Sequence, residues 1–448
     1  MHLPSVNGNS RLHFWLRVRE FAVPPSMIET ATVRRTVGDW AGACAAARVD
    51  VDLDLRAVAR ARGRGFAAWV RADLRHLAPD LLRWHMPRIA PEGLLRPGLT
   101  VSLARYGGMD LVARTPPAWA DAGQRISLAL WDGSVTGLRA YPHPHPDRRF
   151  RLDLHRHLWD ARRAGELRER SGAAAHSPPA AALPPGGAVE VPPGCAVDRW
   201  AAEALLLLHA HGQTGGRVAV RVGARRRLVL DVAAHPSGPP ALTFAAPASG
   251  DPAAPVLPDA ATWVPPDLDL LRSGLLDADL LHPLVAAALV PDRPAANPLD
   301  FGASAPRFVE CRGARHRIGL VAGVLAALDH DPTEIRREEM LAALGGIPLA
   351  CLQAIDDAHR QPERLADVQA RLDHGDAAGA LAAVEAILGP DALMRCGALR
   401  DELDTAAQRQ VTHGLFRAGL IGHAPPRDAQ CRSRRRASRS RPRQATNR

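Results

Sequence analysis

The feature that most constrains the fold of this chain is its scarcity of aromatic side chains. Phe, Trp and Tyr make up 4% of the 448 residues, whereas hydrophobic residues as a whole make up 46%. A chain with this apolar content can bury real cores, but they must be built from Leu, Val and Ala. Because Ala and Leu lose little free energy on entering a helix, the composition favours helices. The length suggests roughly three domains.

All basic residues other than histidine are arginine, because the sequence contains no lysine. This excludes enzymes that depend on a lysine Schiff base, a Walker-A lysine or a kinase-type lysine. Abundant Arg, Ala, Gly and Pro are what a very GC-rich genome produces. The sequence also contains no GxSxG, HExxH or GxGxxG motif.

The net charge of +10 is concentrated at one end of the chain. Residues 424–448 carry nine Arg and one Asp, a net charge of +8, so residues 1–423 carry only +2 and have no global field to attract DNA. The tail predicts phosphate-type contacts with nucleic acid or an acidic partner. The arginines that would make these contacts are Arg432, Arg434, Arg435, Arg436, Arg439, Arg441 and Arg443. The other interpretation is a disordered tail whose Arg content reflects codon bias.

The cellular compartment is indicated by the cysteines and by the apolar runs. Six cysteines without a CxxC pair indicate reduced thiols rather than a disulfide framework. No apolar run reaches the ~18 residues of a membrane helix, and the first residues lack the apolar core of a signal peptide. We therefore expect a soluble, cytoplasmic protein with no membrane partner and no cofactor.

The pattern along the chain predicts an α+β protein, predominantly helical, with helical-hairpin blocks at both ends and small antiparallel β segments between them. Seven segments are expected in order: a disordered extension at 1–23, a helical block at 24–90, a β-rich segment ending in a helix at 91–170, a Pro/Ala/Gly linker at 171–196, a helix plus β-hairpin at 197–265, a helical block at 266–423 and a disordered Arg-rich tail at 424–448.

Local signals support this division. Alternation at 99–106, 109–114 and 125–133 predicts antiparallel strands, and 217–232 predicts a hairpin with a third strand at 241–244. Ser26 and Glu29 form a capping-box pattern at a helix start. VDVDLDL at 49–55 is compatible with a short strand or with a loop and the next helix. Residues 151–170 predict a helix, and the chain from Asp267 almost to the tail is expected to be helical. Helix starts are expected at Asp331-Pro332, Pro362-Glu363 and Gly375-Asp376, and Gly389-Pro390 is expected to end the last of these helices.

Two stretches share the pattern G-D-x-x-G-A-x-A-A, at 38–46 and 375–383. The pattern resembles the turn and second helix of tetratricopeptide-like hairpins, in which Gly-Asp ends one helix and small residues let two helices approach closely. The resemblance covers some 30 residues at each end, and the rest of the repeat consensus is missing. The alternative is two helix starts in an Ala-rich protein.

The clearest enzymatic pattern is Cys311 followed by five residues and Arg317. It resembles the phosphate cradle of cysteine-dependent phosphatases, in which a thiolate attacks phosphorus and Arg binds its oxygens. The context partly fits, since residues 308–310 are compatible with a strand and residues 319–328 with a helix. The sequence departs from the family pattern, with Glu310 where His is usual and Ile318 where Ser or Thr is usual. The alternative is a basic loop with a structural thiol.

Metal sites have weaker support. His143 and His145, in a polyproline-like segment, lie near His155 and His157 in the sequence, but neither pair shares a face, so solvated loop histidines compete with a zinc site. Asp50, Asp52 and Asp54 imitate the start of a calcium loop, but the Gly and Glu that such a loop needs are Leu55 and Ala61. Asp356, Asp357 and His359 are typical of a solvated helix face. We expect no metal site.

The stretches CRGARHR, RREEMLAALGG and CLQAIDDAHR within 311–360 resemble uncharacterised proteins of high-GC actinobacteria. Such proteins are similar to accessory members of systems built around MoxR-type ATPases and von Willebrand A-domain partners. Helical hairpins at both ends, a near-neutral body and the lack of a credible catalytic site favour a non-catalytic interaction or scaffold protein, and the resemblance implies a role accessory to an ATPase system. The observation expected of a scaffold is a groove between helices lined with exposed apolar and Arg side chains. The alternatives are a nucleic-acid-associated protein acting through its tail and a phosphatase at Cys311.

Overall fold

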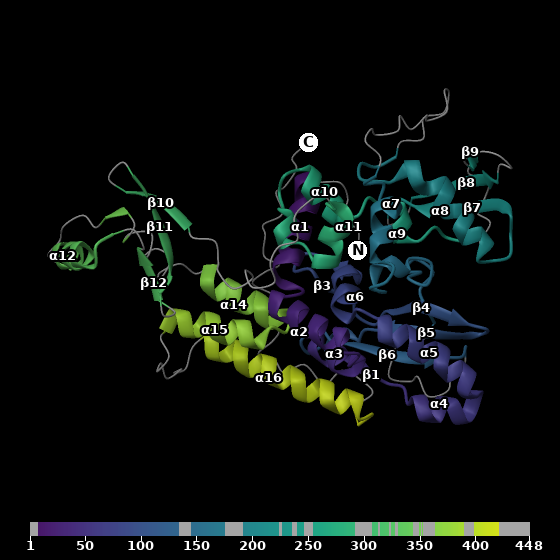
Figure 1. Cartoon of the computed structure of the whole chain (residues 1–448), viewed down its shortest axis with the longest axis horizontal. Coiled ribbons are helices and arrows are strands. Elements are labelled where there is room, and N and C mark those ends of the chain that lie inside the picture. The colour runs from purple at the N-terminus through teal and green to yellow at the C-terminus, as the bar shows by residue number, and fades with distance from the viewer. Residues whose placement is uncertain are drawn as a thin grey trace, which may run out of the picture.

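The computed structural model describes residues 8–133, 145–174, 191–223, 226–234, 240–245, 254–291, 307–311, 314–321, 324–327, 330–343, 349–350, 352, 363–388 and 398–420. Within these ranges the chain has a mixed α+β structure, which confirms the expected class. Figure 1 shows a main body, three helices along one side of it, and a further sheet with a helix beyond them. Every helix in the described ranges is too short or too polar to cross a membrane.

The main body is organised around a four-stranded sheet with the strand order β1-β6-β5-β4. Its strands are β1 (Val49–Val51), β4 (Thr100–Tyr106), β5 (Met109–Arg114) and β6 (Ile126–Trp131). β4, β5 and β6 are antiparallel neighbours, as their alternating sequences predict. β1 is parallel to β6, so the first three residues of the ambiguous stretch form a strand, and Asp54 then caps the next helix.

Five helices accompany this sheet: α2 (Pro25–Thr36), α3 (Trp40–Ala46), α4 (Leu55–Arg62), α5 (Arg64–His76) and α6 (Pro79–His85), of which α4 has no buried residue and packs on α5. A small ribbon of β2 (Arg88–Ile89) and β3 (Leu94–Leu95) follows them. Helices and sheet share one core that contains Val70, Leu82, Leu103 and Leu128, each fully buried. The core is aliphatic, as the composition predicts.

Helix α2 begins without the capping box expected at Ser26. Its N-cap is Pro24, in an extended conformation with no side-chain cap, and Pro25 is the first helical residue. Proline has a preset φ and no N–H, so it leaves one donor fewer to satisfy at a helix start. The helix therefore starts at the two prolines, one residue before the predicted serine, and has no side-chain cap.

Residues 8–21 form helix α1 (Gly8–Phe21), so the expectation of a disordered extension at 1–23 was wrong from residue 8 onward. Val18 is fully buried in the main core. α1 contacts α10 (Pro266–Arg272), and this tertiary contact stabilises a helix whose own sequence has little amphipathic pattern.

Helices α10 and α11 (Pro283–Leu289) belong to the main body rather than to the C-terminal helices. Leu270 and Val285 are fully buried in the same core as the central sheet, and Figure 1 shows α10 beside α1. The expected helical block at 266–423 is therefore divided at residue 291.

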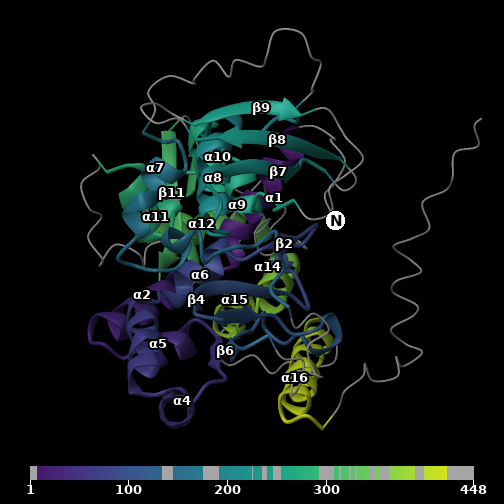
Figure 2. The same cartoon turned by 90° about the vertical axis from the view of Figure 1, so that its right-hand side faces the viewer.

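A second sheet in the main body has the strand order β7-β8-β9, with β7 (Gly215–Arg221), β8 (Arg227–Ala233) and β9 (Ala241–Ala245). This confirms the predicted hairpin and third strand. Helix α8 (Val197–His209) packs on one face through Trp200 and Leu207, and α9 (Asp259–Thr262) lies beside it. Figure 2 shows this sheet at the opposite end of the molecule from α16.

Residues 151–170 do not form the expected helix. They form 3-10 turns at Arg156–Leu158 and Ala164–Glu166 and the short helix α7 (Leu167–Arg170). His155 and His157 are both buried, although two residues spaced by two point in different directions on a helix. Both histidines can be buried because this segment forms 3-10 turns rather than a continuous α-helix.

Residues 307–311, 314–321 and 324–327 form a third sheet instead of continuing the predicted helical block. Its antiparallel strands are β10 (Arg307–Cys311), β11 (Ala314–Val321) and β12 (Val324–Ala327). The β-branched residues of this stretch favour strands over helices. Helix α12 (Pro332–Ala343) follows, and Asp331 caps it as predicted by accepting the Thr333 N–H at 2.8 Å.

The C-terminal unit consists of α14 (Glu363–Asp373), α15 (Ala377–Leu388) and α16 (Ala398–Arg417). Its own small core is built by Val368, Leu372, Ala380 and Val384. α14 begins and α15 ends where the sequence predicts, at Glu363 and before Gly389.

The first Gly-Asp pattern joins α2 to α3. Gly38 takes a left-handed conformation with φ +80°, and the Asp39 carboxylate accepts the Gly42 N–H at 2.8 Å. Arg34, five residues before the aspartate, donates to the same carboxylate at 3.2 Å.

The second Gly-Asp pattern repeats this geometry between α14 and α15. Gly375 has φ +81°, and the Asp376 carboxylate accepts the Gly379 N–H at 3.1 Å. Arg371, again five residues earlier, donates to it at 3.4 Å. The two patterns are therefore the same helix–turn–helix device.

Among the residues that the structure describes, the second turn meets another part of the protein closely and the first does not. A Cβ added to Gly375 would lie 2.5 Å from the Gly123 carbonyl oxygen, whereas one added to Gly38 would meet nothing within 4 Å. Arg48 donates to the His374 carbonyl at 2.7 Å. The turn thus docks the C-terminal unit on the main body.

Helix α16 makes a second contact between the same two parts. Phe416 packs edge-to-face on Trp119 with ring centroids 5.5 Å apart, and His413 donates to the Ala120 carbonyl at 2.9 Å. Arg417 binds Asp52 through both terminal nitrogens. Figure 1 shows α16 running beneath α3 and β1.

Gly375→Ala should destabilise the protein more than Gly38→Ala. Both substitutions place a Cβ in left-handed backbone, which costs roughly 1–2 kcal/mol, but only the first also forces backbone atoms apart, at a further ~1–3 kcal/mol. Urea unfolding would measure the two free energies. Equal losses would show that the Gly123 contact contributes nothing to stability.

Candidate functional site

A hollow with a volume of about 670 Å³, here called the α1–α14 groove, lies within the described part of the chain. It lies where the N-terminal helix meets the C-terminal unit, two segments some 350 residues apart in sequence. Its walls come from α1, from the turn after β2 and from α14. The lining residues are His13, Phe14, Leu16, Arg17, Glu20, Phe21, Ala90, Pro91, Ala366 and Asp367.

The aromatic floor of the groove is fixed by cationic neighbours. Phe21 is 8% exposed, and the guanidiniums of Arg17 and Arg371 lie 5.8 and 5.9 Å from its ring centroid. The His374 ring stacks on it with centroids 6.2 Å apart. Cation–π contacts at this range are worth about 0.5–1 kcal/mol at exposed sites and more when desolvated. They join the two walls of the groove.

Two carboxylates stand at the rim. Asp367 accepts Arg371 Nε at 3.0 Å, whereas Glu20 makes no hydrogen bond or ion pair within the described residues. Partial desolvation, together with Asp367, raises the pKa of Glu20 against the opposing effect of Arg17 and Arg371. The rim can therefore accept a cationic group beside an apolar surface.

A polar junction lies below the groove. The His374 ring donates through Nε2 to the Glu92 carbonyl at 3.0 Å. Burial, followed by the charges of Arg88 and Arg83, lowers the pKa of His374 to about 3. His374 is therefore neutral at neutral pH, which the dense arginine surroundings require.

Helix α1 is held in place by a buried ion pair. Arg19 Nε and Nη2 donate to the two carboxylate oxygens of Asp267, on α10, at 2.6 and 2.9 Å, and both side chains are at most 3% exposed. Trp84 Nε1 donates to the same carboxylate at 3.2 Å, and Arg19 Nη1 donates to the Trp84 carbonyl at 2.9 Å. Three segments distant in sequence converge on this pair.

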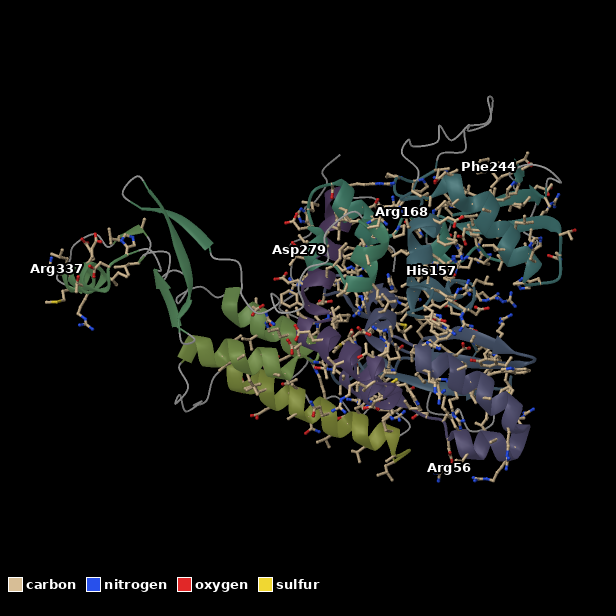
Figure 3. The ribbon with its side chains drawn as sticks, in the orientation of Figure 1. Arg56, His157, Arg168, Phe244, Asp279 and Arg337 are labelled. Atoms are coloured by element: carbon tan, nitrogen blue, oxygen red, sulfur yellow. The ribbon has the colours of Figure 1, made fainter. Side chains whose placement is uncertain are left out.

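A second buried pair lies nearby. His282 donates to Asp80 at 2.9 Å, and its Nδ1 accepts the Leu284 N–H at 3.2 Å, which fixes the proton on Nε2. A third network joins Glu203 on α8 to His155 and Arg170; Figure 3 shows the neighbouring His157 inside the main body. These groups are enclosed, so we assign them to the core rather than to a reaction site.

The structure does not build a phosphate cradle from Cys311 and Arg317. Cys311 ends β10 opposite Ala314, and Arg317 lies within β11 opposite Phe308. The helix expected at 319–328 is replaced by the end of β11 and by β12. A cradle needs a loop that leads into a helix N-terminus, and an antiparallel hairpin has none, so the phosphatase interpretation loses its structural basis.

Most other predicted site residues have structural partners or lie outside the described ranges. Asp50 pairs with Arg125 and Asp52 with Arg417. No group of three or more metal-ligating side chains occurs within the ranges given above. The tail arginines from Arg432 to Arg443, together with His143 and the 356–359 acids and histidine, lie outside them.

Sequence reasoning missed the groove because it assigned residues 1–23 to a disordered extension. One signal was available: Phe14, Trp15 and Phe21 fall within eight positions of a chain in which aromatic residues are scarce. Such a local concentration indicates packing. The sequence of α14, which forms the opposite wall, contains no pattern that predicts its contact with α1.

No protein-family model, curated protein or solved structure matches this chain.

Asp267→Asn should destabilise the protein by about 3–5 kcal/mol, because it leaves the buried Arg19 charge without its partner. The matched control is Asp269→Asn on the same helix. Asp269 also pairs with an α1 arginine, Arg11, at 2.8 Å, but both side chains are partly exposed, so its loss should cost less than about 1 kcal/mol. Chemical denaturation compares the two, and equal losses would contradict a special role for the buried pair.

Stability should also depend on pH through His374. Its folded-state pKa of about 3 lies below the unfolded value near 6.5, so the unfolded state gains the proton first and stability falls as pH drops through this window. Between pH 6.5 and 5 the wild type should lose about 2 kcal/mol more than His374→Gln. The exposed groove residue His13, changed to Gln, is the control. Parallel pH profiles for wild type and His374→Gln would refute the prediction.

Proposed function

We propose that this protein is a non-catalytic interaction protein, or scaffold, that binds a partner protein in the α1–α14 groove. The observation that carries the proposal is the lining of the groove, which combines Phe14, Leu16 and Phe21 with Arg17 between two helices. Such grooves suit an amphipathic helix, whose apolar side chains fill the hollow while its charged side chains meet the rim.

The helical hairpins at the two ends of the chain support the same proposal. α2–α3 and α14–α15 share the left-handed glycine, the aspartate cap and the bracing arginine. They resemble tetratricopeptide-like hairpins, which build concave binding surfaces from stacked helix pairs. We infer that these hairpins form the framework of a predominantly helical interaction protein, with the β segments between them as supports.

The described thiols favour binding over covalent catalysis. Burial raises the pKa of Cys44 and of Cys195 to about 12 each. A thiol becomes a nucleophile only as the thiolate, so neither is suited to attack a substrate near neutral pH.

The resemblance of residues 311–360 to accessory proteins of ATPase systems identifies the first partner to test. A MoxR-type ATPase, or its von Willebrand A-domain companion, from the same cell is that candidate.

The proposal is tested by placing a photo-crosslinking amino acid at position 366 in the groove and, as a control, at 378 on α15. Ala366 and Ala378 are both exposed helix positions on the same unit. We expect position 366 to capture one protein that position 378 does not capture. Mass spectrometry identifies the captured protein and the crosslinked segment.

A quantitative binding test follows with the captured protein. Ala366→Trp fills the groove and should weaken its binding by at least about tenfold, or ~1.4 kcal/mol, whereas Ala378→Trp should not. The same capture pattern at both positions, or unchanged affinity of Ala366→Trp, would refute the groove as the binding site.

A further inference from the structure

The β7–β8 hairpin carries a surface of positive charge that the proposed function does not use. Its strands read GGRVAVR and RLVLDVA, and the hairpin has Arg217, Arg221, Arg226 and Arg227 among its described residues. The body of the protein is close to neutral, so this concentration is local. We propose that the face of this hairpin opposite α8 binds the phosphate backbone of double-stranded nucleic acid.

The strand register places these arginines together. Arg221 is directly opposite Arg227, and Arg217 is opposite Asp231. The alternating residues, such as Val218 and Leu230, are buried against α8. Because successive side chains of a strand point to opposite faces, Arg217, Arg221 and Arg227 share the face that α8 leaves open.

Two directly opposed arginines are unfavourable unless an anion joins them. Opposed residues in antiparallel strands have Cβ atoms about 4.5–5.5 Å apart, and like charges there destabilise the pair. Partial burial and the charges of Arg149 and Arg227 lower the pKa of Arg221. The guanidinium groups of Arg149, Arg221 and Arg227 are therefore close enough to repel one another.

Asp259 and Asp147 oppose this shift of the Arg221 pKa, but both are also hydrogen-bonded to Arg149, and Asp231 on the same face lies 4.0 Å from Arg217 Nε. Asp259 accepts Arg149 Nε and Nη2 at 3.2 and 2.6 Å. Asp147 accepts the backbone N–H of Arg149 at 2.9 Å. Within the described residues, neither the Arg221 side chain nor the Arg227 side chain makes a hydrogen bond or an ion pair. Both remain available for a ligand.

The chemistry of this face favours phosphate diesters in a duplex. The guanidinium group binds phosphate oxygens through two parallel hydrogen bonds. Single-stranded nucleic acid would also need exposed aromatic rings for base stacking, and Phe244, on β9, instead packs edge-to-face near Trp200. A rigid strand pair that presents arginines without stacking rings suits contacts to a duplex backbone, independent of base sequence.

The test must separate this face from the arginine tail. Every protein compared is the full chain with the seven tail arginines from Arg432 to Arg443 changed to Gln. Fluorescence anisotropy measures its binding to a labelled DNA duplex of about 20 base pairs at salt concentrations from about 50 to 200 mM. The test variant is Arg221→Gln with Arg227→Gln, and the control is Arg336→Gln with Arg337→Gln. The control residues are exposed on α12, and Figure 3 shows Arg337 at the opposite end of the molecule from Phe244.

The slope of log K against log salt should become shallower by about 1.8 in the test variant, since each lost phosphate contact removes about 0.9. The control should retain both its slope and its affinity. Identical binding by all three proteins would overturn the proposal, and so would failure of the duplex to bind at all. Binding of a polyglutamate peptide that the duplex cannot displace would overturn it in favour of an acidic protein partner.

Discussion

The buried pair of Arg19 and Asp267 is the interaction on which the rest of the main body depends. It joins helices 248 residues apart in sequence and draws in Trp84, so that α1, α6 and α10 meet at one point. A fully buried charge has no alternative to its partner, because water cannot replace that partner. The position of α1, and with it one wall of the α1–α14 groove, follows from this electrostatic requirement.

Arginine side chains also donate hydrogen bonds to buried backbone carbonyls that lie outside helices and strands. Arg83 is fully buried and donates to the carbonyls of Ala47 and Gln124. Arg88 donates to the carbonyl of Arg83, and Arg48 to that of His374. The planar guanidinium has five donors and can join two loops at once, which a lysine ammonium does less well. A chain without lysine can thus satisfy irregular backbone inside its core.

The sequence predicts those parts of the fold that local patterns determine. Strands β4 to β9 follow from alternation and turn residues, and the Asp39 and Asp376 caps follow from the repeated Gly-Asp pattern. α1 escaped prediction because a helix with little amphipathic pattern depends on contacts hundreds of residues away. The hairpin that contains Cys311 escaped because a short apolar run fits a strand and a helix equally well. The groove was not predictable, since nothing in α1 specifies α14.

The distance along the chain between Arg19 and Asp267 has a consequence for biosynthesis. At about 5–20 residues per second, translation would take about 12–50 seconds to reach the aspartate after the arginine has been made. Throughout that interval the newly made α1, with Phe14, Trp15 and Val18, has no α10 to pack against. The nascent chain thus carries an aromatic segment whose packing is complete only after the second half of the protein has been made.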